Sequence, residues 1–133
     1  MKIGYKALIE DAEKEIETLG LAAARALQHD PDVVFVDLRD VRELAREGKI
    51  PGAFHAPRGM LEFWVDPESP YHKNVFSSGK RLVFYCQSGW RSALATHTVQ
   101  EMGLANVCHV GGGYRAWKDS GAPTEPVPER HGH

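Results

Sequence analysis

The chain has 133 residues, of which 42% are hydrophobic and 26% charged, close to the averages of globular proteins. This length allows one domain with its own core, and the composition excludes a disordered, collagen-like or disulfide-scaffold protein. A formal charge of −2 without a basic run excludes nucleic acid as an expected partner. No stretch approaches the ~18 apolar residues of a membrane span, and residues 1–17 are too charged for a signal peptide, so we expect a cytoplasmic protein without membrane contact.

The N-terminal residues 1–32 are predicted to form a helical segment packed on the same domain. An amphipathic helix that covers a sheet is expected first, and the Ala- and Leu-rich residues 21–28 predict a second short helix. Residues 16–19 are alternatively a short edge strand. The apolar positions of the first helix recur at helical spacing: Leu8, Ala12, Ile16 and Leu19.

Three runs of β-branched and aromatic residues predict strands buried on both faces of a parallel sheet. A helix from about Ser92 to Met102 lies between the last two, with Ala95, Val99 and Met102 on its inner face. Strand, helix and strand imply a right-handed crossover, so the fold class is α/β. The three runs are Val33 to Val36, Arg81 to Tyr85 and Asn106 to Val110.

Residues 56–79 contain no clear strand, although they exceed the ~12 to 15 residues at which unstructured loops become unusual. Met60 to Trp64 predict one or two helical turns. Residues 58–79 have two alternative interpretations. They are either an excursion packed on the sheet edge or a flap that faces the substrate. We divide the chain into residues 1–32, a core at 33–121, and a Pro-rich flexible tail at 122–133.

Three predicted strands run directly into turns that carry chemistry or glycine. Asp37 to Arg39 follow the first strand, Cys86 to Arg91 the second, and Gly111 to Gly113 the third. Because parallel strands end at the same edge of a sheet, these turns share the carboxyl edge, where open α/β folds bind ligands. The sequence therefore predicts a site at this edge.

Cys86 and Cys108 are too few for a disulfide framework, and neither has the spacing of a zinc or thioredoxin motif. We expect no metal and no cofactor, and any cysteine chemistry should be nucleophilic. Cys108 lies in a predicted central strand and is interpreted as a small core residue, with a resolving role as the alternative.

The loop that begins at Cys86 has the features of a reactive thiol. A thiol at a helix N-terminus, beside free backbone N–H groups and the cation of Arg91, is favoured as the thiolate. Gly89 lets successive amides point inward and hold a polarised sulfur. We interpret Cys86 as an ionised, accessible nucleophile, whereas an inert buried thiol is the alternative. The other candidate site residues of this loop are Gln87, Ser88, Gly89, Trp90, Arg91 and Ser92.

Four segments, in this order, resemble the signatures of single-domain rhodanese-like sulfurtransferases. The likeness runs from about Val33 to Gly121 and implies an open parallel sheet of about five strands with helices on both faces. The segments are the Asp-x-Arg turn at Asp37 to Arg39, the G-x-I-P-G-A segment at Gly48 to Ala53, the C-x-x-G-x-R-S loop at Cys86 to Ser92, and the G-G-x-x-A-W motif within Val110 to Trp117.

This resemblance implies a sulfurtransferase that works through a cysteine persulfide. Cys86 would take a sulfane sulfur from a small donor such as thiosulfate and pass it to cyanide, a thiol or an acceptor protein. The loop amides would stabilise the anion, with Arg91 as charge partner and no general base. Gln87 stands where the family often has Arg, which removes one cation that would steer thiosulfate.

Several nearby residues have supporting interpretations. Asp37 and Arg39 are expected to form an internal ion pair that fixes the neighbouring turn. His55 is expected to pack or cap locally. Trp90 should project outward, where it would shield the persulfide or anchor an acceptor protein, or else pack on residues 60–64.

Two rival functions remain. One is a persulfide carrier or regulatory binding module without efficient turnover. The other is a Cys-dependent phosphatase or arsenate reductase, whose loop has five residues between Cys and Arg. Here Arg91 comes five positions after Cys86 and Ser92 is the sixth. The smaller loop suits a single sulfur better than a phosphate.

Overall fold

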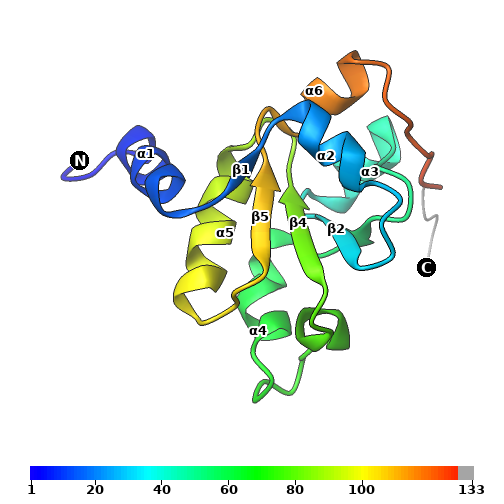
Figure 1. The fold of residues 1–133 in the computed structure, drawn as a ribbon. Coiled ribbons are helices and arrows are strands. Elements are labelled where there is room, and N and C mark those ends of the chain that lie inside the picture. The colour runs from blue at the N-terminus through cyan, green and yellow to red at the C-terminus, as the bar shows by residue number, and fades with distance from the viewer. Residues whose placement is uncertain (129–133) are drawn as a thin grey trace.

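The computed structural model describes residues 1–128 and contains one five-stranded sheet whose neighbouring strands all pair in parallel (Figure 1). This confirms the predicted fold class and the three predicted strands. Across the sheet, the order is β1 (Thr18–Leu19), β5 (Val107–Val110), β4 (Arg81–Tyr85), β2 (Val33–Asp37) and β3 (Phe54–His55).

Helices cover both faces of the sheet, as expected for an α/β fold. None of the helices within residues 1–128 is long and apolar enough to cross a bilayer. The helices are α1 (Tyr5–Glu15), α2 (Leu21–Leu27), α3 (Val41–Glu47), α4 (Leu61–Val65), α5 (Trp90–Glu101) and α6 (Gly113–Asp119), with 3-10 turns η1 (Arg58–Met60) and η2 (Asn74–Ser77).

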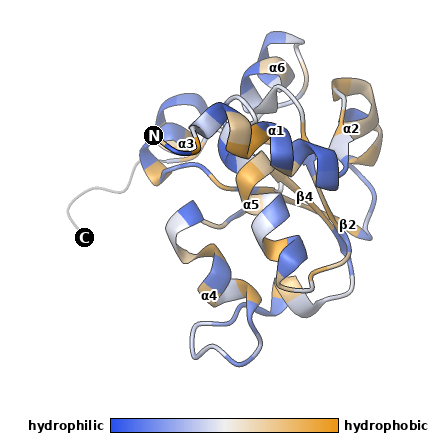
Figure 2. Ribbon diagram, turned by 90° about the vertical axis from the view of Figure 1, so that its left-hand side faces the viewer, coloured by the Kyte–Doolittle hydropathy of each residue, from blue (hydrophilic) through white to orange (hydrophobic). Residues whose placement is uncertain are grey.

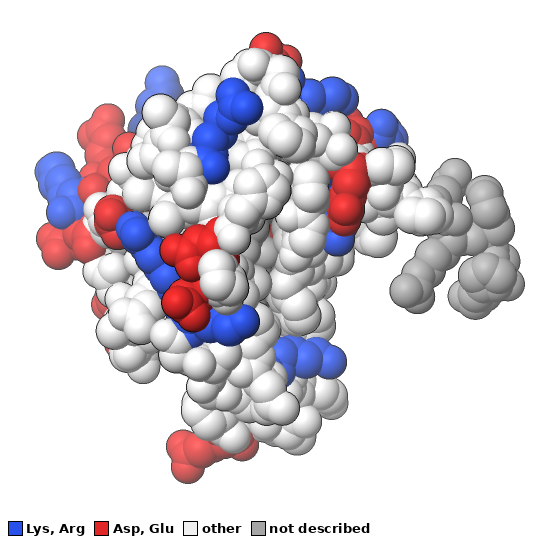
Figure 3. All heavy atoms as spheres, turned by 45° about the vertical axis from the view of Figure 1, so that its right-hand side comes forward, with Lys and Arg blue, Asp and Glu red and all other residues white. Residues whose placement is uncertain are grey.

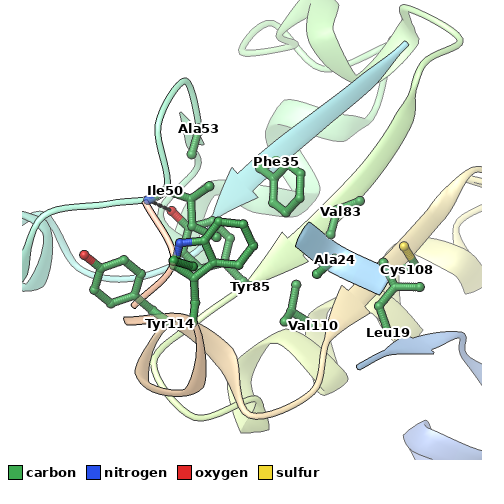
Figure 4. Packing of buried hydrophobic residues seen from close by; sticks show 12 residues of the cluster. Leu19, Ala24, Phe35, Ile50, Ala53, Val83, Tyr85, Cys108, Val110 and Tyr114 are labelled. Carbon is green, nitrogen blue, oxygen red and sulfur yellow. Dashed lines mark hydrogen bonds between the residues drawn. The ribbon is translucent and has the colours of Figure 1, made fainter. Parts of the chain in front are cut away.

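One face of the sheet packs against α2 and α6. Trp117 of α6 lies edge-on to Phe35 of β2, with ring centroids 6.0 Å apart. Tyr85 of β4 is fully buried there, and its hydroxyl accepts a hydrogen bond from the backbone N–H of Ile50 (Figure 4). This bond satisfies the one polar group of Tyr85 in an otherwise apolar layer.

The other face packs against α5 and α4. Ala95 and Val99 of α5 are fully buried in a cluster with strand residues such as Phe84. Met102, predicted on the same face, is exposed because the helix ends at Glu101. In Figure 2, β2 and β4 are largely hydrophobic, whereas the surrounding helices are mixed, as expected for a sheet with both faces covered.

The N-terminal helix was predicted to cover the sheet, but it packs on another helix. α1 packs on α5 and stands away from the sheet (Figure 1), because Ile9 and Ala12 form its buried stripe while Leu8 is exposed. The alternative edge strand within residues 16–19 is confirmed as β1, which pairs with β5.

Two elements between β2 and η1 were not expected. α3 begins with a capping box in which the Asp40 carboxylate accepts from the helix backbone and Glu43 accepts from the Asp40 N–H. β3 is too short to give a sequence pattern of its own. The predicted helical turns in the long excursion are present as η1 and α4.

The first residues of the expected loose tail are fastened to the domain. Lys49 and Glu125 exchange two backbone hydrogen bonds, each 2.9 Å long. The indole N–H of Trp117 donates to the carbonyl of Pro123, and Ala122 is buried. The expectation of a loose tail is therefore wrong for residues 122–125, and His131 and His133 lie outside the described residues.

Candidate functional site

The predicted site lies at the carboxyl edge of the sheet. Asp37, the last residue of β2, is in register with Tyr85, the last residue of β4, so Cys86 emerges directly beside it. The N–H of Leu38 donates to the carbonyl of Tyr85 and continues this pairing past the strand ends. Gly111 follows the neighbouring β5. The three turns singled out in the sequence therefore meet at one edge.

The backbone of Cys86 is held by the start of α6. The Tyr114 N–H donates to the Cys86 carbonyl at 2.8 Å, and the Arg115 N–H to the Gln87 carbonyl at 3.1 Å. Gly113, at φ 61°, packs so closely that a Cβ there would stand 2.5 Å from the Cys86 carbonyl oxygen. The glycine turn is thus required by a close approach of two backbones.

Backbone N–H groups converge on the sulfur of Cys86. The Gly89 N–H lies 3.2 Å from Sγ and the Ser92 N–H 3.4 Å, while the Ser92 hydroxyl oxygen is 3.6 Å away. Gly89 adopts φ 105° as the cap of α5, which turns its N–H inward. N–H groups directed at sulfur stabilise negative charge on it.

Cys86 is fully buried, contrary to the expectation of an accessible thiol. The loop curls over its own sulfur because the two amides point inward, and Ser92 closes the site from α5. The exposed residues of the loop are Ser88 and Trp90.

Arg91 is engaged by a carboxylate of α3. Its Nη1 and Nη2 donate to the two oxygens of Glu43 at 2.8 and 2.9 Å. The Arg91 hydrogen bonds hold the pKa of Glu43 below its usual value. The cation expected to pair with the Cys86 anion is therefore already paired with Glu43.

The expected ion pair of Asp37 and Arg39 is present and completely buried. Arg39 Nη2 lies 2.7 Å from Asp37 Oδ2 and also donates to the Gly48 carbonyl at 2.7 Å. The guanidinium stands 4.2 Å from the ring centre of Tyr114. Arg39 thereby contacts β2, the end of α3 and α6, next to the loop of residues 86–91.

Gln87 connects the loop to this buried cation. Its amide oxygen accepts from Arg39 Nη1 at 3.2 Å, and its amide nitrogen donates to Glu47 of α3 at 3.2 Å. The rim of the site therefore carries carboxylates of Glu43 and Glu47 close to the loop. On the face shown in Figure 3, acidic and basic side chains alternate without a broad area of one sign.

A histidine that the sequence analysis did not select stands behind Ser92. His109 Nδ1 is 2.9 Å from the Ser92 hydroxyl oxygen, and its Nε2 is 3.0 Å from that of Thr18. Burial lowers the pKa of His109 to about 4. The sequence contains a signal for His109, because successive side chains of a strand point to opposite faces of the sheet. His109 must therefore point away from the side of Cys108 and toward the helix that carries Ser92.

The remaining candidates take local positions. Trp90 is 54% exposed and packs on Tyr5 of α1, at 5.1 Å between ring centres, and not on residues 60–64. His55 is hydrogen-bonded to the carbonyl of Arg39, as expected for local packing. Cys108 lies in the apolar cluster on the α2 and α6 face, as expected for a core residue. Within residues 1–128 no three His, Cys, Asp or Glu side chains gather as metal ligands would.

Comparison with known proteins finds relatives that are named as sulfurtransferases. Residues 21–120 match the family described as Rhodanese-like domain. The chain is 32% identical to human thiosulfate:glutathione sulfurtransferase over 106 residues, which cover 75% of this chain and 91% of the relative. It is 31% identical to the mouse thiosulfate sulfurtransferase/rhodanese-like domain-containing protein 3 over 98 residues, 70% of this chain but only 62% of the relative's length.

A solved structure from Rhodopseudomonas palustris resembles the whole chain. It shares 54% identity, has a TM-score of 0.91, and the match covers 94% of this chain and 96% of the other. That protein is described as one of unknown function and a possible tyrosine phosphatase. A match over 94% of this chain extends beyond residues 21–120, the part that the family model matches.

Proposed function

The chain belongs to the rhodanese-like domain family, and from this premise we propose that it transfers sulfane sulfur through a persulfide on Cys86. The observation that carries the proposal is the convergence of the Gly89 and Ser92 N–H groups on the Cys86 sulfur, at the N-terminus of α5. Such donors favour an anionic sulfur over a neutral one. The sulfurtransferase names of the human and mouse relatives support the same chemistry.

The reaction has two displacements at sulfur. In the first, the Cys86 thiolate attacks the outer sulfur of the donor. A new bond forms to Sγ, and the old sulfur–sulfur bond breaks with its electron pair on the leaving group, which is sulfite when thiosulfate is the donor. In the second, a thiolate or cyanide attacks the outer sulfur of the persulfide. The bond to Sγ then breaks, and Cys86 returns as the thiolate.

The loop contributes electrostatic stabilisation in both steps. The amides of Gly89 and Ser92 already lie within reach of Sγ, so little reorganisation is needed when charge builds on the sulfur. Because Cys86 is fully buried, the loop must open before a donor can reach the sulfur. A shielded sulfur also protects the persulfide from unspecific acceptors.

The surroundings of the loop weaken the case for thiosulfate as natural donor. Glu43 neutralises Arg91, and Gln87 adds no positive charge. A dianionic donor thus meets carboxylates at the rim instead of a free cation. We therefore propose a small sulfane-sulfur donor of lower charge than the thiosulfate dianion, such as cysteine persulfide, with thiosulfate as an artificial substrate.

The test is loading followed by discharge. The protein is incubated with thiosulfate or cysteine persulfide, and intact mass spectrometry detects the addition of one sulfur atom. We expect loading of the protein and of Cys108→Ser, no loading of Cys86→Ser, and release as thiocyanate when cyanide is added. Failure of the unmodified chain to load with either donor would refute the proposal.

Two rival functions are separated by the same samples. Loading without turnover by cyanide or glutathione identifies a persulfide carrier or regulatory module. The description of the Rhodopseudomonas palustris protein makes phosphatase activity the second rival. Hydrolysis of an aryl phosphate above the level of the Cys86→Ser variant would establish it, although the loop is one residue shorter than phosphate requires.

A further inference from the structure

A continuous chain of side-chain hydrogen bonds leads from the buried sulfur of Cys86 to the protein surface. The Ser92 hydroxyl oxygen lies 3.6 Å from Sγ, His109 Nδ1 lies 2.9 Å from that oxygen, and His109 Nε2 lies 3.0 Å from the Thr18 hydroxyl oxygen. Ser92 and His109 are buried, whereas Thr18 is exposed. The chain thus joins a sulfur without solvent contact to a residue that is exposed at the surface.

Three separate elements bring these residues together. Thr18 of β1 is paired with His109 of β5 in the sheet register. His109 and Val107 share the face of β5 that packs against α5, and Ser92 belongs to the first turn of that helix. Thr96, one helical turn later, fixes the same stretch by donating its hydroxyl to the Ser92 carbonyl at 2.7 Å.

The imidazole of His109 has neutral partners on both sides. Its side-chain contacts are the hydroxyls of Ser92 and Thr18, and burial alone lowers its pKa. The charged groups near the other end of the chain are Arg91 of α5, its partner Glu43 of α3, and Asp37 of β2. A neutral imidazole has one N–H and one lone pair, so it can orient the two hydroxyls in either of two opposite directions.

We propose that Ser92, His109 and Thr18 form a reversible hydrogen-bond chain whose direction follows the charge of Cys86. This inference rests on the proposed role of Cys86 as the sulfur-carrying residue. With a thiol, Sγ–H donates to Ser92, Ser92 donates to Nδ1, and Nε2–H donates to Thr18. With a thiolate, every bond is reversed: Thr18 donates to Nε2, Nδ1–H donates to Ser92, and Ser92 donates to sulfur.

The reversal accounts for every proton. The Sγ proton passes to the Ser92 oxygen, the Ser92 proton to Nδ1, the Nε2 proton to Thr18, and the Thr18 proton to water. One proton leaves Cys86 and one reaches the solvent, while His109 stays neutral throughout. His109 is a positioning residue, because it acts on the sulfur through Ser92. The chain supplies the deprotonation route that a buried nucleophile needs in the absence of a base in the loop.

The first test follows the tautomer of His109 by the ¹⁵N chemical shifts of its ring nitrogens as the pH is varied. We expect the N–H to move from Nε2 to Nδ1 at the pH at which thiolate absorbance shows that Cys86 loses its proton. The change should persist in Cys108→Ala and vanish in Cys86→Ala. Ring shifts that stay constant while Cys86 ionises would overturn the inference, whether or not the protein carries sulfur.

The second test is a double-mutant cycle with thiolate absorbance as the readout. Ser92→Ala and His109→Phe should each raise the pH at which Cys86 ionises by about one unit, because the thiolate loses an oriented donor. The double variant should shift no further than Ser92→Ala, since His109 acts through that hydroxyl. Thr98→Ala, in the same helix but outside this chain of hydrogen bonds, is the matched control and should not shift it.

Additive shifts in the double variant, or none in His109→Phe, would contradict the proposal. If His109→Phe does not fold, Thr18→Val replaces it, because Thr18 is exposed and valine has the same shape. Thr18→Val should also raise the pH of ionisation, and an unchanged value refutes the chain. None of these readouts needs a donor, so they are independent of the sulfur-loading experiment.

Discussion

Asp37 and Arg39, two residues apart in the chain, form an ion pair in which neither side chain has any exposed surface. The pair is joined by Nη2–Oδ2 at 2.7 Å and by Nε–Oδ1 at 3.0 Å. Arg39 also donates to the Gly48 carbonyl and to Gln87. This geometry needs the planar fork of arginine, which lysine does not provide.

We therefore predict that Arg39→Ala lowers the free energy of unfolding by about 3 to 5 kcal/mol, because it leaves an unpaired buried carboxylate. Arg39→Lys should also destabilise the protein. Arg42→Ala is the control: Arg42 pairs with Asp40 at the surface, where solvent screens the pair, and its loss should destabilise the protein far less. Urea denaturation of the three variants measures the difference. Equal losses for Arg39→Ala and Arg42→Ala would contradict this account.

Gly113 tests whether the close approach of α6 positions Cys86. Gly113→Ala places a methyl group 2.5 Å from the Cys86 carbonyl oxygen, so the loop must shift and sulfur loading should fall at least about tenfold. Gly121→Ala has a similar positive φ of 80° with no atom within 4 Å. It should cost only about 1 to 2 kcal/mol of stability and leave loading unchanged. Mass spectrometry and urea denaturation separate the two effects, and normal loading of Gly113→Ala would count against the positioning role.

Glu43 should control the response to anionic donors. Glu43→Gln keeps the shape of the side chain but removes the charge that holds Arg91, so the freed cation can attract thiosulfate. We expect KM for thiosulfate to fall about fivefold, equivalent to about 1 kcal/mol. Glu62→Gln, in a half-buried pair with Arg58 away from the Cys86 loop, is the control and should leave KM unchanged. Steady-state kinetics at low salt measures KM for thiosulfate in both variants. An unchanged or raised KM for Glu43→Gln would disprove the electrostatic explanation.

Burial of His109 makes stability depend on pH. Its pKa is about 4 in the folded protein and near 6.5 when exposed, so between these values the unfolded chain binds the extra proton. Stability therefore falls as the pH falls through this window, by about 2 kcal/mol from pH 7 to 5. His109→Phe should lose this slope, whatever its absolute stability. Urea denaturation at pH 7 and 5 gives the slopes, and identical slopes would refute the assignment.

The fold was predictable where long apolar runs or motifs mark the elements. The runs that became β2, β4 and β5 are continuous, and the helix between β4 and β5 implies that these two strands are parallel. β3 has only two residues. α3 begins with a capping box, but the helix itself has only a short apolar stripe. Such elements are fixed by tertiary pairing, so they leave a weak signal in the sequence.

The same distinction applies to the site. Cys86 and the loop amides follow from local sequence, and so does the pairing of Asp37 with Arg39. The partners of Arg91 and Ser92 do not, because Glu43 and His109 come from distant elements. Burial of the thiol was missed since a loop that points its amides inward also closes around the sulfur.

The edge strand β1 has a consequence for anyone who trims this protein. The family match begins at residue 21, whereas β1 ends at Leu19 and carries Thr18. A fragment cut at the family boundary would leave β5 with unpaired N–H and carbonyl groups, an open template for association with other chains. Such a fragment should aggregate.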